Sequence, residues 1–199
     1  MTRFKTLFAP KQATLPDATW LVVGLGNPGA KYAATRHNVG YMCVDLLIDA
    51  TPHPPLAPLA GYKAEATQLT PEALAVRSTT FMNQSGQGVA PLAETLGIPP
   101  ERIIVIHDEL DLPAGTVRVK KGGNENGHNG LKSLTHELGT RDYLRVRIGI
   151  SRPPAGQPVP EYVLEPVSDG QPGIELAAEA VNLILSKGLA AAQNEIHGR

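Results

Sequence analysis

The hydrophobic positions along the chain follow two periodicities, which predict strands and helices in alternation. Short apolar or alternating runs rich in β-branched residues are typical of strands, whereas apolar residues three and four apart indicate helices. Strands are predicted over residues 19–25, 61–68, 73–77, 102–106, 116–120 and 143–150. Helices are predicted over residues 40–50, 85–96, 128–138, 174–185 and 188–196.

This alternation predicts one α/β domain with a mixed, twisted central sheet flanked by helices. Residues 102–106 (RIIVI) read as a central strand, whereas residues 143–150 alternate in polarity and indicate a strand with one exposed face. The strands at 61–68 and 73–77 are joined by a short turn, and such a pair makes the sheet mixed. The domain is expected to span residues 18–199, after a flexible N-terminal extension over residues 1–17.

The composition is that of an ordinary globular protein. The chain has 199 residues, of which 42% are hydrophobic and 19% charged, enough to bury a core without disulfides. No apolar run is long enough to cross a bilayer, and the N-terminal residues lack the apolar stretch of a secretory signal. The single cysteine, Cys43, excludes an internal disulfide and fits a reducing compartment, so a cytoplasmic location is expected.

The net charge of −1 conceals an uneven distribution. Between Arg118 and Arg152 the chain has eight basic and three acidic residues, whereas acids predominate elsewhere. A basic stripe of this kind indicates a phosphate-contacting surface, although a solvated charge run fits the composition equally well. Within it, residues 120–130 (KKGGNENGHNG) are predicted to form a phosphate cradle before a helix, with Arg145 and Arg147 on one strand face holding further phosphates.

A glycine pattern near the first strand formally matches the dinucleotide-binding fingerprint. Gly24, Gly26 and Gly29 have the required spacing, but the residues after them are too polar and irregular for the packed helix that must follow. Asp45 has the spacing of the ribose-binding acid, yet it lies inside a predicted helix. The pattern therefore gives little support to a dinucleotide site.

Polar residues gather at the predicted ends of strands, where α/β sheets carry their functional groups. Asn27, Asn83 and Asn129 each lie at such a junction, and together they would form a neutral pocket suited to amides, hydroxyls and a ribose. Taken singly, each asparagine is equally explained as a turn-capping residue.

A histidine and a carboxylate at strand ends form a candidate general-base pair. Asp108 follows the strand at 102–106 and could orient His37, so that the free imidazole nitrogen takes a proton from water. From spacing alone, a structural role for His37 is equally compatible. His107 and His128 are predicted to be structural or peripheral, and no metal-ligand spacing is present.

The ordered set of these segments resembles the bacterial-type peptidyl-tRNA hydrolase family. The matching stretches are VGLGNPG (23–29) with Tyr32, TRHN (35–38), TTFMN (79–83) with Ser85-Gly86, HDELDLP (107–113), GHNGLKS (127–133) and RIGI (147–150). The chain departs from the family pattern at Gln84 and in the loop GGNENGHNG, which affects no proposed catalytic group.

The resemblance implies a monomeric enzyme without metal or cofactor. Its substrate would be peptidyl-tRNA, bound by the acceptor stem and 3′ end, and its reaction the hydrolysis of the ester between peptide and 3′-terminal ribose, which recycles the tRNA. The resemblance implies His37 as the base, Asp108 as its orienting carboxylate, and Asn27 as the residue that separates peptidyl-tRNA from aminoacyl-tRNA. It further implies substrate- and tRNA-binding roles for Tyr32, Phe81, Asn83, Asn129, Lys120 and Arg147. The alternatives are a non-catalytic RNA-binding protein on the same fold and a metal-dependent hydrolase.

Overall fold

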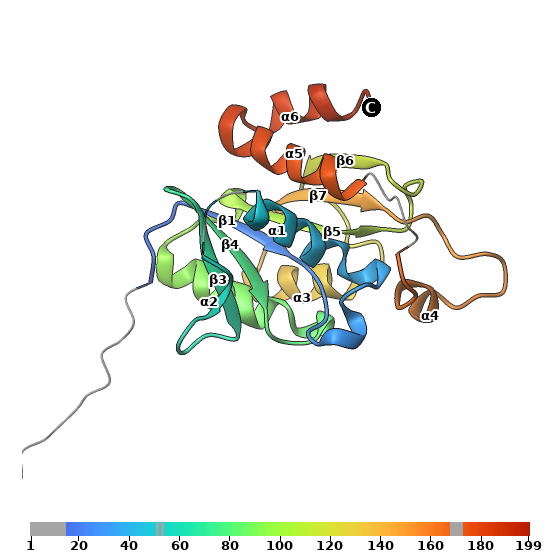
Figure 1. Cartoon of the computed structure of the whole chain (residues 1–199), viewed down its shortest axis with the longest axis horizontal. Coiled ribbons are helices and arrows are strands. Elements are labelled where there is room, and N and C mark those ends of the chain that lie inside the picture. Colours follow the sequence, from blue (N-terminus) through green and yellow to red (C-terminus); the bar gives the residue numbers. More distant parts are fainter. Residues whose placement is uncertain (1–14, 51, 53, 168–172) are drawn as a thin grey trace, which may run out of the picture.

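The computed structural model describes residues 15–50, 52, 54–167 and 173–199, and their centre is a seven-stranded mixed sheet. Its spatial order is β2-β3-β4-β1-β5-β7-β6 (Figure 1). The strands are β1 (Trp20–Gly24), β2 (Ala57–Pro58), β3 (Ala64–Thr70), β4 (Ala73–Ser78), β5 (Ile103–Glu109), β6 (Val117–Lys121) and β7 (Leu144–Gly149). The four central strands run parallel, and the outer pairs β2–β3, β3–β4 and β6–β7 are antiparallel. The predicted mixed sheet is thereby confirmed.

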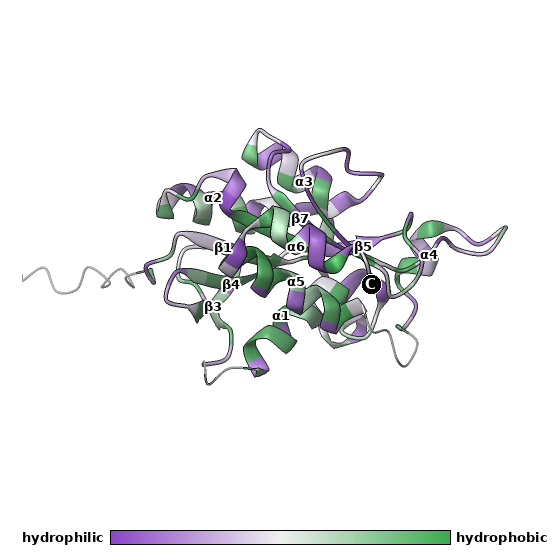
Figure 2. Ribbon diagram, turned by 90° about the horizontal axis from the view of Figure 1, so that it is seen from above, coloured by the Kyte–Doolittle hydropathy of each residue, from purple (hydrophilic) through white to green (hydrophobic). Residues whose placement is uncertain are grey.

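Helices cover both faces of the sheet and bury two separate apolar cores. They are α1 (Val39–Asp49), α2 (Gly86–Leu96), α3 (Asn129–Leu138), α4 (Val159–Val163), α5 (Gly173–Lys187) and α6 (Leu189–Ile196). One core packs α1, α5 and α6 against the sheet, and the other packs α2 and α3 against the opposite face. Figure 2 shows α2 and α3 on one side and α1 and α5 on the other. Among these described helices, none is long and apolar enough to span a membrane.

One glycine of the pattern that imitates a dinucleotide fingerprint, Gly24, is required by a close backbone contact with Gly40. A Cβ on Gly24 would lie 2.4 Å from the carbonyl oxygen of Gly40, and a Cβ on Gly40 would lie 2.3 Å from that of Ile106. The start of α1 therefore packs directly on the backbone of β1 and β5. After β1 the chain forms two 3₁₀ turns, Ala30–Tyr32 and Arg36–Asn38, and not the packed helix that a dinucleotide site needs.

The structure differs from the predicted elements in several places. Strand β7 has buried residues on both faces, because the loop after β6 covers Arg145, and only Arg147 is half-buried. The short elements β2 and α4 were not predicted, since two- and five-residue segments carry no measurable periodicity. The extension predicted over residues 1–17 falls largely on residues 1–14, outside the described residues, and stays a prediction.

Candidate active site

A pocket of about 490 Å³ opens near the carboxyl ends of the central strands. The side chains that line it include Asn27, His37, Asn83, Asp108 and Asn129. These five residues come from different loops and elements, and the fold brings them to one place. The clustering predicted for these residues is therefore found, while their individual roles stay predictions.

The His37 ring is held by the carboxylate of Asp108. Nδ1 of His37 lies 2.9 Å from Oδ1 and 3.0 Å from Oδ2 of Asp108, whose side chain is 3% exposed. Because a carboxylate only accepts hydrogen bonds, Nδ1 carries the proton and Nε2 keeps its lone pair. Burial lowers the pKa of His37, but the charge and hydrogen bond of Asp108 outweigh it, so the net pKa is raised.

Asp108 has a second histidine partner, His128. Nε2 of His128 lies 2.9 Å from Oδ1 of Asp108, and its Nδ1 accepts the backbone N–H groups of Gly130 and Leu131 at 3.1 and 3.3 Å. Nδ1 is therefore the unprotonated nitrogen, and the proton on Nε2 is donated to Asp108. The prediction that His128 is structural or peripheral is confirmed for the structural role, because the ring caps α3; the same ring also lines the pocket.

His37, Asp108 and His128 lie close enough to ligate a metal ion, with one potential ligand atom of each within 4.8 Å of the others. The hydrogen bonds disfavour this use. A neutral imidazole has one unprotonated nitrogen, and that of His128 is occupied by two backbone amides. These three residues fit a carboxylate held between two N–H donors better than a metal centre. Burial raises the pKa of Asp108, but the two histidines together hold it well below its ordinary value.

Asn38, which the sequence did not single out, fixes the backbone of Asn27. Its Oδ1 accepts the N–H of Asn27 and its Nδ2 donates to the C=O of Asn27, both at 2.9 Å. The side chain of Asn27 accepts the N–H of Met82 at 2.8 Å through Oδ1, so its NH₂ group remains to donate into the pocket. Among the described residues, the side chains of Asn83 and Asn129 have no hydrogen-bond partner.

The comparisons with known proteins agree on one family. The family model for peptidyl-tRNA hydrolase matches residues 21–199. The chain is 76% identical over its full length to "Peptidyl-tRNA hydrolase 2" of Corynebacterium glutamicum, of which it covers 97%. It is 48% identical to a peptidyl-tRNA hydrolase of Mycobacteroides abscessus, over 92% of this chain and 97% of the relative.

The chain belongs to the peptidyl-tRNA hydrolase family. A crystal structure of the Acinetobacter baumannii peptidyl-tRNA hydrolase matches the fold with a TM-score of 0.83 at 32% identity, covering 92% of this chain and 96% of that one. The resemblance read from the sequence motifs is thus confirmed, together with the predicted fold class and the prediction of a hydrolase.

The two aromatic residues assigned to tRNA by the peptidyl-tRNA hydrolase resemblance lie side by side outside the pocket lining. The rings of Tyr32 and Phe81 meet edge to face with centroids 6.4 Å apart, and Phe81 is 55% exposed. Phe81 directly precedes Met82 and Asn83, which do line the pocket. An exposed aromatic beside the pocket is available for stacking with a base.

The basic residues of the chain make more contacts within the protein than the sequence suggested. Arg145 is 1% exposed and donates to the C=O groups of Gly123 and Asn124 at 2.7 Å, so the prediction that it holds a phosphate is wrong. These two hydrogen bonds instead hold the glycine-rich loop against β7. Arg147 pairs with the buried Glu109 at 3.6 Å. Among the described residues, Lys120 forms no ion pair with an acid.

The predicted phosphate cradle at the start of α3 is contradicted at the helix N-terminus. A helix N-terminus binds anions through its free N–H groups. Two of those groups, on Gly130 and Leu131, already donate to the ring of His128. The loop before α3 therefore presents a capped helix, and its residues Asn126 and Gly127 contribute to the wall of the pocket.

Proposed function

We propose that this chain hydrolyses the ester between the peptide and the 3′-terminal ribose of tRNA, with His37 as general base and Asp108 as its orienting carboxylate. The observation that carries the proposal is the paired contact of His37 Nδ1 with both oxygens of Asp108. It leaves Nε2 of His37 as an acceptor in a pocket otherwise rich in neutral amides. Family membership supplies the substrate class.

The reaction follows from the proton positions. Nε2 of His37 takes a proton from a water molecule, whose oxygen attacks the ester carbonyl carbon. The negative charge of Asp108 stabilises the imidazolium that forms, and the tetrahedral intermediate then expels the ribose 3′-oxygen as it receives the proton back from Nε2. A general base of this kind contributes a rate factor of about 10²–10⁴.

The orientation of Asn27 supports selectivity for an N-blocked substrate. Met82 occupies Oδ1 of Asn27, so the group that Asn27 offers is an N–H donor. A peptide carbonyl accepts such a hydrogen bond, whereas the charged α-amine of aminoacyl-tRNA is itself only a donor. The side-chain amides of Asn83 and Asn129, which have no partner among the described residues, would position the rest of the ester and can donate to the oxyanion.

The tRNA would extend from the pocket over the aromatic and basic residues. In this proposal Tyr32 and Phe81 contact the 3′-terminal bases, and Lys120 with Arg147 lie along the phosphates of the acceptor stem. We further propose that the protein works as a monomer in the cytoplasm, where its substrate is produced; light scattering of the purified chain tests the first point.

The deciding experiment is hydrolysis of an N-acetyl-aminoacyl-tRNA in the presence of EDTA, with the unblocked aminoacyl-tRNA as control. The wild-type chain is expected to cleave only the blocked substrate at an appreciable rate. His37→Ala should lower kcat by at least about 10²-fold and leave tRNA binding intact. Asn27→Asp keeps the acceptor for Met82 but removes the donor, so it should reduce the preference for the blocked substrate. Wild-type turnover by His37→Ala would sink the assignment of the base.

A further inference from the structure

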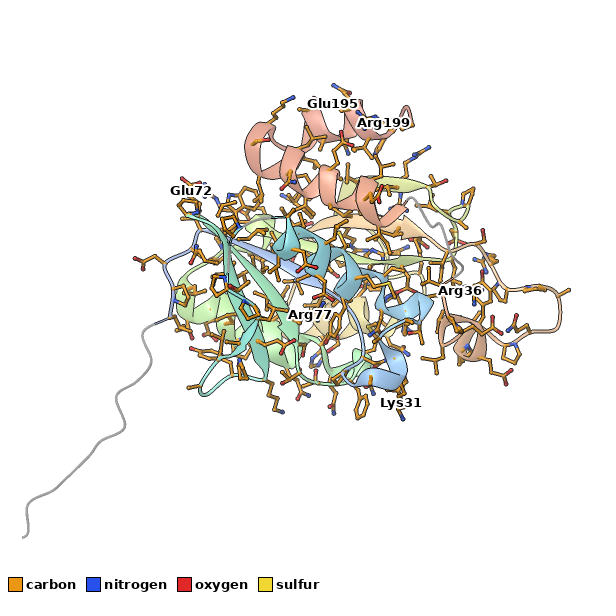
Figure 3. All side chains as sticks on the ribbon, in the orientation of Figure 1. Lys31, Arg36, Glu72, Arg77, Glu195 and Arg199 are labelled. Atoms are coloured by element: carbon orange, nitrogen blue, oxygen red, sulfur yellow. The ribbon has the colours of Figure 1, made fainter. Side chains whose placement is uncertain are left out.

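The residue before the base, Arg36, joins the turn that carries His37 to helix α4. Its Nη1 donates to the C=O of Tyr162 at 2.9 Å and to Oε2 of Glu165 at 2.7 Å. The guanidinium also lies over the ring of Tyr162, 4.1 Å from its centroid. Figure 3 labels Arg36 beside α4, at one end of the molecule. None of the roles described above uses this side chain.

The backbone around Arg36 makes the same connection. The N–H of Arg36 donates to the C=O of Glu165 at 3.0 Å, and the N–H of Val167 donates to the C=O of Ala34 at 2.8 Å. Thr35 and Pro166 form an isolated antiparallel bridge between these hydrogen bonds. The segment that follows α4 is therefore docked, by main chain and side chain together, on the turn that holds His37.

Helix α4 and the residue after it form the apolar wall of the pocket. Val159, Val163 and Leu164 line the pocket together with His37 and contribute only aliphatic side chains to it. Val159 and Leu164 remain 39% and 43% exposed, so their apolar surface is available to a ligand. Such a wall fits a hydrocarbon side chain next to the ester, in contrast to the amides of the three asparagines.

We infer that Arg36 is a positioning residue that sets the distance between this apolar wall and the base, and thereby the acceptance of bulky apolar side chains on the amino acid esterified to tRNA. This inference rests on the proposed function. The pair of Arg36 with Glu165, whose side chains are 17% and 46% exposed, adds little to stability because solvent screens it. Its consequence is geometric, since one guanidinium fixes a carbonyl, a carboxylate and an aromatic ring at once.

Lysine is a poor substitute at this position. Its ammonium can reach Glu165, but it lacks the planar group that stacks on Tyr162 while donating in two directions. Arg36→Lys therefore keeps the charge and removes the geometry. Glu165→Gln is a milder variant that keeps the stacking and the bond to the Tyr162 carbonyl. Arg102, stacked on Trp20 at 5.6 Å before the amino end of β5, provides a matched control as Arg102→Lys.

The test compares two substrates, N-acetylphenylalanyl-tRNA and N-acetylglycyl-tRNA, with each variant. Arg36→Lys should lower kcat/KM about 10-fold for the phenylalanyl substrate and less than about 2-fold for the glycyl substrate. Glu165→Gln should change the same ratio in the same direction by less, and Arg102→Lys should not change it. The acid limb of the pH profile should stay in place, because His37 and Asp108 are untouched.

Three results would overturn the inference. An equal loss on both substrates would mean a general structural role, unchanged kinetics on both would mean no role, and a shifted acid limb would mean a direct effect on His37. If Arg36→Lys does not fold, Glu165→Gln decides the question by the same ratio. A wild-type chain that cleaves neither substrate would instead refute the proposed function, so the two failures are distinguishable.

Discussion

The side chain of Asn38 holds Asn27 by both backbone polar groups, with two hydrogen bonds of 2.9 Å. Asn38 directly follows His37 and is 1% exposed. A single turn of chain thus carries the proposed base and the clamp on the proposed selectivity residue. Any displacement of that turn would move both relative to the ester.

Removing the clamp is expected to reduce activity through substrate positioning. Asn38→Leu leaves the N–H and C=O of Asn27 buried without partners, at a cost to stability of about 1–3 kcal/mol for each group. We expect kcat/KM for an N-acetyl-aminoacyl-tRNA to fall at least about 10-fold while the acid limb of the pH profile stays unchanged. Gln68→Leu is a matched control, because Gln68 also donates from its amide to backbone, 2.6 Å from the C=O of Thr70, on strand β3. A shifted limb would contradict this explanation.

The shared carboxylate of Asp108 makes a prediction about pH dependence. His128 donates an N–H to Oδ1 of Asp108, and this hydrogen bond weakens the effect of the Asp108 charge on His37. His128→Asn keeps an oxygen that can cap α3 but loses this donor, so the pKa of His37, already raised, should rise further. Because activity needs neutral His37, the acid limb of kcat/KM should move to higher pH, by less than about one unit.

The control for this shift is a histidine on the same helix. His136 lies on α3 with its side chain 84% exposed, and His136→Asn should leave the limb in place. A downward shift in His128→Asn would show that His128 does not compete with His37 for Asp108.

Much of the fold could be predicted because long periodic segments dominate it. The apolar run of β5 and the amphipathic pattern of α2 required no tertiary information, and Gly97 ends that helix in the left-handed conformation that glycine readily adopts. Helix α4 could not be predicted, because five residues give no periodicity and its position depends on Arg36 and the segment around Glu165.

The site was predicted in part, and its omissions share one cause. His37 and Asp108 are 71 residues apart, yet their types suffice to suggest a base and its orienting acid. Asn38 and His128 act through hydrogen bonds to Asn27 and Asp108 that exist only after folding. The prediction for Arg145 was wrong because an alternating strand pattern does not show whether a polar face is exposed or covered by a loop.

The phosphate contact proposed for Lys120 should be visible when tRNA binding is measured at increasing salt concentration. Burial, followed by the charges of Arg147 and Arg145, lowers the pKa of Lys120, and an anion nearby would relieve that repulsion. Lys120→Ala should weaken tRNA binding and reduce the slope of log K against log salt by about 0.7–0.9 if it contacts one phosphate. Lys187→Ala, which removes the ion pair between Lys187 on α5 and Glu195 on α6, should leave the slope unchanged.

Arg147→Ala should act by a second route as well, because it leaves the buried carboxylate of Glu109 without its basic partner. We expect a loss of stability in addition to weaker tRNA binding. The double variant Arg147→Ala with Glu109→Gln should recover the stability but not the binding. Recovery of both in thermal unfolding and filter-binding assays would show that Arg147 does not contact tRNA.

His107 should make the fold sensitive to mild acid. Burial holds the pKa of His107 well below its ordinary value, and the proximity of the His128 imidazole lowers it further, against the opposing effect of Asp108. The unfolded chain binds a proton below about pH 6.5 that the folded chain excludes. The stability contributed by neutral His107 is therefore complete above that pH and is lost as the pH falls, by about 1.4 kcal/mol per pH unit. His37 does not cancel this loss, since its raised pKa adds stability that is already complete below pH 6.5.

The measurement is urea unfolding at pH 7, 6 and 5. The free energy of unfolding should depend less on pH for His107→Gln than for the wild type, whereas His136→Gln should match the wild type. Equal slopes for all three proteins would mean that His107 is protonated in the folded state.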